Sequence, residues 1–365
     1  MRNYFERRCA VSKSNVQSAR VTLHDVAAKT GLSRATVSKA LNDRPDVSVA
    51  TRLAVRTAAE ELGYLRSTQS GPSTFPHIAL VSDSLKSPYT MEVISGAAVE
   101  SQHMGFGLTV WQLDETPDDS PLTPRAIEPL SEDWLRLIAS RGYLGIVLVT
   151  APISEGLVSL AEDLNIPIVS VDSPQVPPKG VRELGATNWR GGKDATGYLF
   201  SLGHRRIAFV SGPPRSVPSQ DRMQGYLSAH QIAGVAVDDT LIVEGGFTFE
   251  SGFTAGRKLF TQPRSQWPTA VFAASDQSAL GVIEAARATG LRVPRDLSVI
   301  GFDDTLMAWS SSPQLTTVRQ PIRQLGALSI RTLLDARKGI DTGGALQLTT
   351  ELIVRSTTAP APELM

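Results

Sequence analysis

The chain has 365 residues, enough for two or three domains with ample core, and its 36 Lys and Arg balance 36 Asp and Glu. Hydrophobic residues make up 41%, and no apolar run approaches the ~20 residues of a membrane helix. One cysteine excludes a disulfide framework, and the first residues lack the apolar segment of a secretory signal. We therefore expect a globular, cytoplasmic protein without a metal or other cofactor.

The two signs of charge are distributed unevenly. Residues 1–66 carry twelve Lys and Arg against six Asp and Glu, which leaves 24 basic and 30 acidic residues in the remainder. A basic character concentrated in one small domain is typical of nucleic-acid binding. Residues 1–20 are polar and basic, and we expect them to form a disordered arm.

Residues 21–65 have the pattern of three short helices. Thr22 followed by Asp25 is a variant of the capping box, Gly31 suits a helix end, and Ser33 suits the start of a second helix. The tight turn of residues 30–33 between two helices predicts a helix-turn-helix. The side chains that we expect to point inward are Leu23, Val26, Ala27 and Thr30 in the first helix, Val37, Ala40 and Leu41 in the second, and Leu53, Val55, Ala58, Ala59 and Leu62 in the third.

The second of these helices has the side chains needed to read DNA. Arg34 and Lys39 suit guanine edges, and Ala35 suits a thymine methyl group. Hydroxyl groups nearby could donate to phosphates, which position the protein without specifying sequence. The predicted DNA-binding residues are Thr22, Ser33, Arg34, Ala35, Thr36, Ser38, Lys39 and Asn42. The alternative is a plain three-helix bundle with a solvated, charged face.

From His77 onward, short apolar runs alternate with helical segments. The runs that are typical of strands covered on both faces are HIALVSD, GLTVWQ, LGIVLVT, IPIVSVD, RIAFVSG, AVFAAS and LSVIGFDD. Segments such as DQSALGVIEAARATG between them have helical spacing. This alternation predicts a doubly wound α/β fold, and the number of strands indicates two lobes. A ligand is then expected between the lobes, at the carboxyl ends of strands.

The helix-turn-helix segment resembles that of the LacI/GalR family of bacterial repressors. Other blocks similar to the family's, in the family's order, are IPIVSVD, TNWRGG, LGHRRIAFVSG, DRMQGY, AASDQSALGVIEAA, LSVIGFDDT and PQLTTVRQP. The resemblance runs from about Val21 to Thr357. It implies an N-terminal helix-turn-helix domain, then a two-lobed, periplasmic-binding-protein-like core that binds a small-molecule effector. It also implies a homodimer on a pseudo-palindromic operator in double-stranded DNA, and a repressor.

The resemblance implies that the chain has five segments. It also implies that each lobe of the core is formed by two separate stretches of the chain. The segments are the arm 1–20, the helix-turn-helix domain 21–65, the linker 66–76, the core 77–357 and the tail 358–365. The predicted N-lobe is 77–186 plus 319–338, and the predicted C-lobe is 187–318 plus 339–357.

Family motifs also imply residues that bind the effector. Arg222 corresponds to an Arg that holds polar effector groups, Asp303 and Asp172 to carboxylates that accept from hydroxyls, and Phe247 to a stacking aromatic. The alternatives are a surface Arg, loop-capping carboxylates and a core aromatic. The predicted effector-binding residues are Tyr89, Asp172, Arg222, Phe247, Ser275 and Asp303, with Trp189 as a weaker candidate. Ser275 stands where the family often has Asn, and Asp276 after it is expected either to be structural or to support the residues that contact the effector.

These residue types suit a polyhydroxylated ligand. Carboxylates and a forked guanidinium satisfy several hydroxyls, and an aromatic face covers the apolar side of a pyranose. An anionic ligand would fit the two carboxylates poorly, so the expected effector is a neutral sugar or oligosaccharide. The alternative effector is a nucleobase or phosphorylated metabolite acting as corepressor.

The linker departs from the family pattern. Gly71-Pro72 stands where the family has a hinge helix, and no Leu is in register to wedge into the minor groove. We predict a weak or absent hinge helix over residues 66–74.

Two other classes of function fit the sequence less well. An enzyme is not expected, because the motifs G-x-S-x-G, H-E-x-x-H and G-x-x-x-x-G-K-[ST] are absent. A solute-binding protein would share the core but should have a signal peptide and no DNA-binding head.

Overall fold

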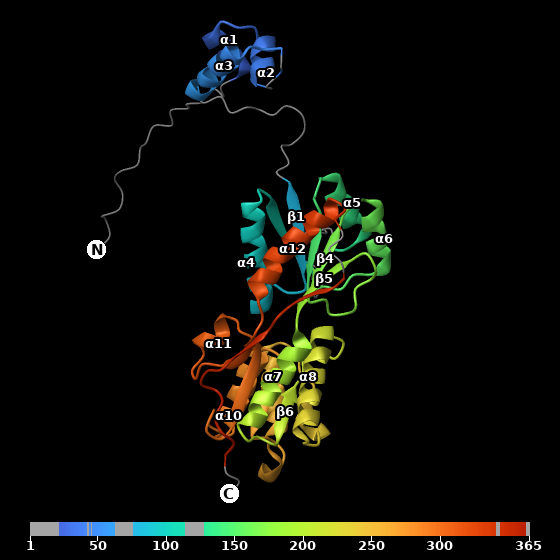
Figure 1. The fold of residues 1–365 in the computed structure, drawn as a ribbon, viewed down its shortest axis with the longest axis vertical. Coiled ribbons are helices and arrows are strands. Elements are labelled where there is room, and N and C mark those ends of the chain that lie inside the picture. The colour runs from blue at the N-terminus through green and yellow to red at the C-terminus, as the bar shows by residue number, and fades with distance from the viewer. Residues whose placement is uncertain are drawn as a thin grey trace, which may run out of the picture. The chain divides into compact units, whose positions relative to one another are not determined.

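The computed structural model describes residues 22–41, 44, 46–62, 76–113, 128–340 and 344–362. The chain divides into two compact units, Met1–Ser73 and Thr74–Met365, called here the head and the core (Figure 1). Each is described by itself. The predicted arm at residues 1–20 and the hinge prediction for residues 66–74 lie outside the described residues.

The head contains the three helices that the sequence predicts. They are α1 (Leu23–Thr30), α2 (Arg34–Leu41) and α3 (Val49–Leu62). Asp25 accepts hydrogen bonds from the backbone N of Thr22 at 2.7 Å and from its hydroxyl at 2.8 Å, as the capping pattern indicates. Gly31 ends α1 with a φ of 67°, a left-handed conformation that glycine adopts without strain. The small core is built on Val26, Val37 and Val55, which are fully buried.

One expected core residue of the head is wrong. Leu53 is 67% exposed, whereas Val55, Ala58 and Ala59 of the same helix are buried. The buried positions recur three and four residues apart, as 3.6 residues per turn requires. Leu53 lies two residues before Val55 and therefore faces away from the head's core.

The N-lobe of the core is a six-stranded parallel sheet covered on both faces. Its strands in spatial order are β11 (Leu346–Leu348), β5 (Arg182–Ala186), β4 (Ile168–Val171), β3 (Ile146–Val149), β1 (His77–Ser82) and β2 (Gly107–Gln112). The helices are α4 (Pro88–His103), α12 (Ile322–Arg337), α5 (Glu132–Ser140) and α6 (Glu155–Asp163). Helices α4 and α12 lie on one face of the sheet, and α5 and α6 lie on the other (Figure 1).

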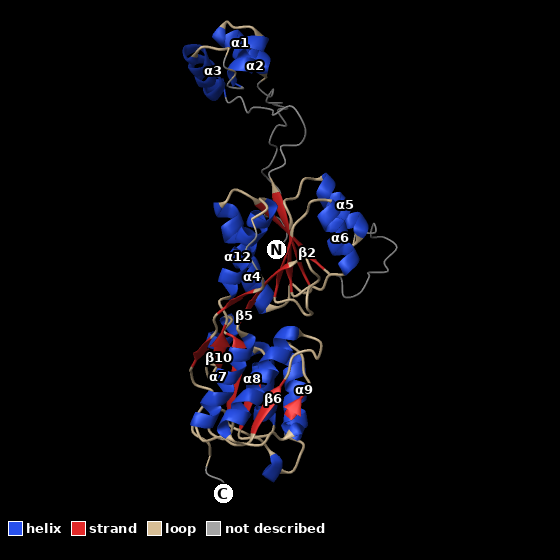
Figure 2. Ribbon diagram, turned by 45° about the vertical axis from the view of Figure 1, so that its right-hand side comes forward, coloured by secondary structure: helices blue, strands red, loops and turns tan. Residues whose placement is uncertain are grey.

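The C-lobe repeats this architecture. Its strands in spatial order are β12 (Glu351–Ile353), β10 (Thr316–Arg319), β9 (Ser298–Asp303), β8 (Ala270–Ala273), β6 (Ile207–Val210) and β7 (Ile242–Val243), and only the β10–β12 pair of this described sheet is antiparallel. The helices are α7 (Asn188–Ser201), α8 (Val217–Ala233), α9 (Phe249–Leu259), α10 (Asp276–Ala288) and the short α11 (Leu306–Ser310), with 3₁₀ turns at Asp239–Leu241 and Arg264–Gln266. Figure 2 shows helices and strands of both lobes by colour.

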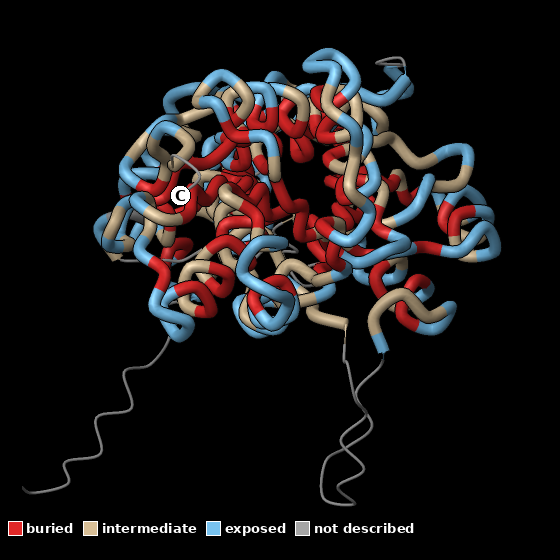
Figure 3. The backbone as a smooth tube through the Cα atoms, turned by 90° about the horizontal axis from the view of Figure 1, so that it is seen from below, coloured by how far each residue is buried: buried red, intermediate tan, exposed pale blue. Residues whose placement is uncertain are grey.

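Successive residues of the central strands enter opposite cores. In β1, Ile78 packs on the α4/α12 side and Ala79 on the α5/α6 side. In β6, Ile207 packs with α7 and α8, and Ala208 packs with α9 and α10. Figure 3 shows the buried residues concentrated in the interior of the core. A strand with apolar side chains on both faces needs helices on both faces, which is why the near-continuous apolar runs fold as doubly wound sheets.

Three pairs of helices cross at reciprocal glycines. A Cβ on Gly192 of α7 would lie 2.3 Å from the carbonyl oxygen of Arg222, and a Cβ on Gly225 of α8 would lie 2.2 Å from that of Trp189. Gly96 and Gly326 have the same relation between α4 and α12, as do Gly252 and Gly281 between α9 and α10. These helices are therefore in backbone contact, and the α7–α8 crossing fixes where Arg222 lies.

The chain passes between the lobes after β5, after β10 and after β11. Two of these crossings are joined, because Thr187 N donates to Leu348 O at 2.9 Å and the hydroxyls of Thr187 and Thr350 lie 2.9 Å apart. One predicted boundary is wrong: the predicted C-lobe includes residues 339–357, but β11 within them pairs with β5 in the N-lobe sheet. A three-residue strand carries no local signal of the sheet edge it joins, so the pairing depends on tertiary contacts.

No helix among the described residues is both long and apolar enough to cross a membrane.

Candidate functional site

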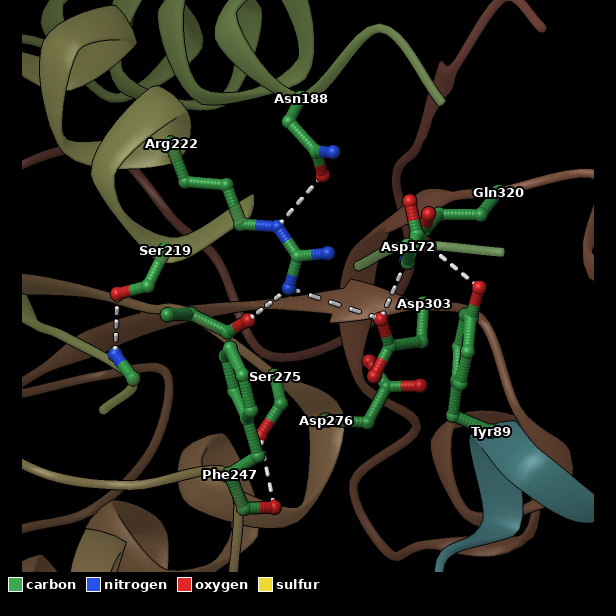
Figure 4. A network of polar contacts seen from close by, with 12 residues as sticks. Tyr89, Asp172, Asn188, Ser219, Arg222, Phe247, Ser275, Asp276, Asp303 and Gln320 are labelled. Carbon is green, nitrogen blue, oxygen red and sulfur yellow. Dashed lines mark hydrogen bonds and ion pairs between the residues drawn. The ribbon is translucent and has the colours of Figure 1, made fainter. Parts of the chain in front are cut away.

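Arg222 lies at the centre of a polar network between the two lobes (Figure 4). It is on the second turn of α8 and is only 4% exposed. Its Nε donates to Asn188 Oδ1 at 2.8 Å, and its Nη1 donates to the carbonyl of Ala274 at 2.5 Å. The guanidinium carbon lies 3.8 Å from the centre of the Phe302 ring. These contacts hold the guanidinium in one orientation.

Asp303 is the carboxylate closest to this guanidinium. It ends β9 with a φ of 119°, and its Oδ1 lies 3.8 Å from Nη1 of Arg222. Gln320 Nε2 donates to the same oxygen at 2.7 Å. Burial raises the pKa of Asp303 to about 6, although the charge of Arg222 opposes this rise.

Asp172 and Tyr89 form the N-lobe part of the network. Asp172 directly follows β4, and Tyr89 lies in the first turn of α4, after the Pro88 that opens the helix. The phenol of Tyr89 donates to Asp172 Oδ2. Burial raises the pKa of Asp172, and burial beside this carboxylate raises the pKa of Tyr89 well above its usual value. The N-lobe therefore presents a carboxylate and a phenol at the carboxyl edge of its sheet.

The two lobes meet at this point. Val217 N, at the start of α8, donates to Pro174 O, two residues beyond Asp172, at 3.2 Å. Burial raises the pKa of Asp172, and the charge of Arg222 opposes that rise. Burial also raises the pKa of Asp303, and the charge of Asp172 adds to that rise. Predicted effector residues from both lobes thus lie within one electrostatic network.

Phe247 is beside Arg222, and Ser275 has a role within the fold. The guanidinium carbon lies 5.5 Å from the centre of the Phe247 ring. The hydroxyl of Ser275 accepts from Ser278 N at 3.1 Å as the N-cap of α10 and donates to Phe247 O at 3.2 Å. Ser275 therefore fixes the loop that carries the aromatic ring, and its contact with an effector stays a prediction.

Asp276 has the contacts of a structural residue. Its side chain accepts from Thr305 N at 2.8 Å and from the Thr317 hydroxyl at 2.5 Å. Trp189, the weaker candidate, is 44% exposed, and Lys193 Nζ lies 5.1 Å from the centre of its ring. Trp189 has no part in the network of Figure 4.

Sequence reasoning missed several members of the network. Asn188 and Gln320 fix Arg222 and Asp303, and Ser219 accepts from Gly212 N at 2.9 Å. The signal was present, because the blocks TNWRGG and TTVRQP contain two of these residues. The described residues contain no group of three or more His, Cys, Asp or Glu that could hold a metal ion.

The predicted DNA-reading residues lie on α2 of the head. Ser33, Arg34, Ala35 and Lys39 are exposed. Ser33 Oγ accepts from Thr36 N at 3.1 Å and lies 2.8 Å from the Thr36 hydroxyl, so this pair caps the helix. Lys39 Nζ forms an ion pair with Asp46 at 2.6 Å.

The other predicted DNA contacts are placed as follows. Thr22 is exposed at the start of α1, and Ser38 is half-buried on α2. Asn42 lies outside the described residues. Contact of each residue with DNA stays a prediction.

The pKa of Asp303 predicts a pH dependence of stability. The pKa of Asp303 is higher in the folded chain than in the unfolded chain, so protonation of this carboxyl group stabilises the fold. The stabilisation is complete below about pH 4, the ordinary pKa of Asp, and it is lost as the pH rises through about 6. Asp303→Asn should therefore lose stability less steeply than the native chain over this range. Urea unfolding at a series of pH values would measure the slopes, and parallel curves would contradict the prediction.

The head and the core match known families. Residues 22–67 match the family described as bacterial regulatory proteins, lacI family, and residues 196–358 match the periplasmic binding protein-like domain. The repressor CytR of Escherichia coli is 32% identical over 356 residues, covering 96% of this chain and all of that protein. The regulator CelR of Thermobifida fusca is 34% identical and covers 92% of this chain and 98% of that protein.

Solved structures give the same result. A complex of CelR with cellobiose is 33% identical with a TM-score of 0.67, and a lac repressor dimer bound to operator and the anti-inducer ONPF is 26% identical with a TM-score of 0.75. Each covers 93% of this chain and 100% of the other chain. The three-helix head and two-lobed core thus define a DNA-binding transcriptional regulator, not an enzyme. The chain belongs to the lacI family of bacterial regulatory proteins.

Proposed function

We propose that this regulator is a cytoplasmic repressor whose affinity for its operator is controlled by a sugar or oligosaccharide bound between the lobes. The observation that carries the proposal is the network of Arg222, Asp303, Asp172 and Tyr89 at the carboxyl edges of both sheets. Carboxylates and a fixed guanidinium suit a ligand with several hydroxyls. The solved CelR structure holds cellobiose, which supports the same class here.

Control of operator affinity requires two states of the core. A ligand shifts their populations only if it binds one state more tightly than the other. The Val217–Pro174 hydrogen bond joins the two lobes, and the hydroxyls of Thr187 and Thr350 join two of the crossings between them. A change in lobe angle would strain these contacts. The proposed effector would alter that angle. This change would alter the spacing of the two DNA-binding heads of a dimer and so the affinity for the operator.

We further propose that the chain acts as a homodimer on a pseudo-palindromic operator. The lac repressor neighbour is a dimer on its operator, and two large apolar side chains of α11, Leu306 and Trp309, are 57% and 54% exposed. Sedimentation equilibrium would test the dimer. A monomer at concentrations that saturate the operator would contradict it.

Gel-shift titration tests the effector class. An operator recovered by selection from random duplexes would be titrated with neutral sugars, including cellobiose, and separately with nucleosides and sugar phosphates. The expected result is a sugar-dependent change in operator affinity. A change produced by a nucleobase or phosphate compound alone would replace the sugar with the alternative, a corepressor of that class.

Arg34→Ala tests the proposed reading of bases. Its side chain is exposed at the first position of α2, so removal should relax the base preference at one position of each half-site by about 1–3 kcal/mol. Selection from random duplexes with native and variant protein measures the preference. Lys29→Ala is the control, since Lys29 forms an ion pair with Glu61 at 2.7 Å. A loss that is equal for all sequences would make Arg34 a phosphate contact.

A further inference from the structure

The chain leaves β9 through two adjacent carboxylates that have different partners. Asp303 lies 3.8 Å from Nη1 of Arg222, in the network between the lobes. Asp304 is paired instead with two other arginines of the C-lobe. Arg319 Nε, at the end of β10, donates to its Oδ2 at 2.7 Å, and Arg355 Nη2, just after β12, lies 2.6 Å from its Oδ1.

The pairs of Asp304 are shielded from water and fixed in place. The side chain of Asp304 is 5% exposed and that of Arg355 is 14% exposed. Arg355 is itself held, because its Nη1 donates to Leu315 O at 2.9 Å and its backbone N donates to the Thr316 hydroxyl at 2.9 Å. Its contact with Oδ1 is an ion pair without the alignment of a hydrogen bond. Removing one partner of such a pair leaves the other charge uncompensated.

The backbone around these carboxylates has an unusual conformation. The φ angles of Asp303 and Asp304 are 119° and 59°. Residues other than glycine rarely adopt a positive φ, and two in succession persist only where the surrounding contacts hold them. On one side Gln320 N donates to Asp303 O at 3.2 Å, and on the other Asp276 accepts from Thr305 N at 2.8 Å. Between these two contacts, the paired side chain of Asp304 is the charged anchor.

The direction of the Asp303 side chain depends on this conformation. The backbone has only two soft dihedral angles per residue, and here the chain is held on both sides. A change of φ at Asp304 therefore has to be compensated at Asp303, which redirects the Cα–Cβ bond of Asp303. The carboxylate would then leave Arg222, because the guanidinium is held by Asn188 and Ala274 and does not follow.

We propose that Asp304 is a positioning residue for the effector. Through its ion pairs with Arg319 and Arg355 it holds Asp303 toward Arg222, in the arrangement that binds hydroxyls of the ligand. The proposal rests on the sugar site proposed above, and it adds a residue that motif resemblance did not assign to that site. If Asp304 only stabilised the fold, its removal would lower stability and leave Asp303 in place.

Crystal structures of the native chain and of variants test the position of Asp303 without any ligand. In Asp304→Ala, residue 304 should adopt a negative φ, and the Asp303 carboxylate should move out of ion-pair distance of Arg222, about 4 Å. Asp304→Asn should keep the native arrangement, because Asn tolerates a positive φ and its amide oxygen can still accept from Arg319. An Asp303 that stays in place in Asp304→Ala would overturn the proposal. Arg319→Ala, which removes the half-exposed partner, provides the same test should Asp304→Ala fail to fold.

Calorimetry on the full chain measures the effect on binding. The probe is cellobiose, or the neutral sugar of the gel-shift panel that the native chain binds most tightly. Asp304→Ala should bind it about tenfold more weakly than the native chain, and Asp304→Asn should recover most of the loss. Glu284→Ala is the matched control and should bind like the native chain, since Glu284 is an exposed carboxylate of the same lobe, 2.6 Å from Arg287.

The outcomes separate this proposal from the sugar class. Native affinity in Asp304→Ala would overturn the role of Asp304 and leave the sugar class intact. If the native chain binds none of the neutral sugars, the sugar class is wrong, and the crystal structures alone decide whether Asp304 positions Asp303. Operator binding without sugar verifies that each variant is folded.

Discussion

Replacing Arg222 with alanine is expected to abolish the effect of the sugar on operator affinity and to lower the free energy of unfolding by about 3 kcal/mol. The substitution leaves Asp303 buried without its counter-charge and removes the donors to Asn188 and Ala274. Gel shift with and without effector measures the first effect, and urea unfolding measures the second. Arg222→Lys should recover part of the stability but little of the response, because an ammonium cannot reproduce the fork of hydrogen bonds.

The control for this prediction is Arg287→Ala. Arg287 is exposed on α10 and forms an ion pair with Glu284 at 2.6 Å. Exposed pairs contribute about 0–1 kcal/mol, so this variant should keep both the stability and the response. Equal loss of stability in the two variants would contradict the structural role assigned to Arg222.

Gly225→Ala is expected to destabilise the C-lobe by about 3 kcal/mol and to weaken the effector response at the same time. The added Cβ would lie 2.2 Å from Trp189 O and 2.6 Å from Lys193 N, both of which are backbone atoms. The two helices must separate to accommodate it. Because Arg222 on α8 bonds Asn188 on α7, this separation would also displace the guanidinium.

Gly197→Ala is the matched control on α7. A Cβ there meets no heavy atom within 4 Å, and alanine is the better helix former, so the variant should be neutral or more stable by about 0.5–1 kcal/mol. Thermal and urea unfolding of both variants would measure the difference. Similar stabilities would show that the helix crossing tolerates an extra methyl group.

Local patterns were enough to predict most of the fold. The seven apolar runs coincide with strands of the two sheets, and the caps at Thr22 and Ser33 begin helices where expected. Apolar periodicity and capping involve residues a few positions apart, so they can be recognised along the chain. The prediction that Leu53 is buried was wrong because Leu53 lies two residues from Val55, and helical periodicity places buried residues three or four apart.

Predictions that depended on distant partners were less complete. Local sequence does not specify which distant residues will pair. Examples are the sheet that β11 joins, the ion pair between Lys39 and Asp46, and the contacts of Asn188 and Gln320. Motif resemblance identified Arg222, Asp303 and Asp172 singly, but it gave no account of their burial or of the charge around them.

The class of protein, a basic helix-turn-helix head on a two-lobed α/β core, could be predicted from the sequence, because capping, periodicity and motif blocks are local properties. The electrostatics between the lobes could not be predicted in this way. The charge between the lobes is set by which side chains are buried together, such as Arg222, Asp303 and Asp172, and by the partners they have. That balance depends on distance and desolvation, which exist only once the two sheets and their helices are packed.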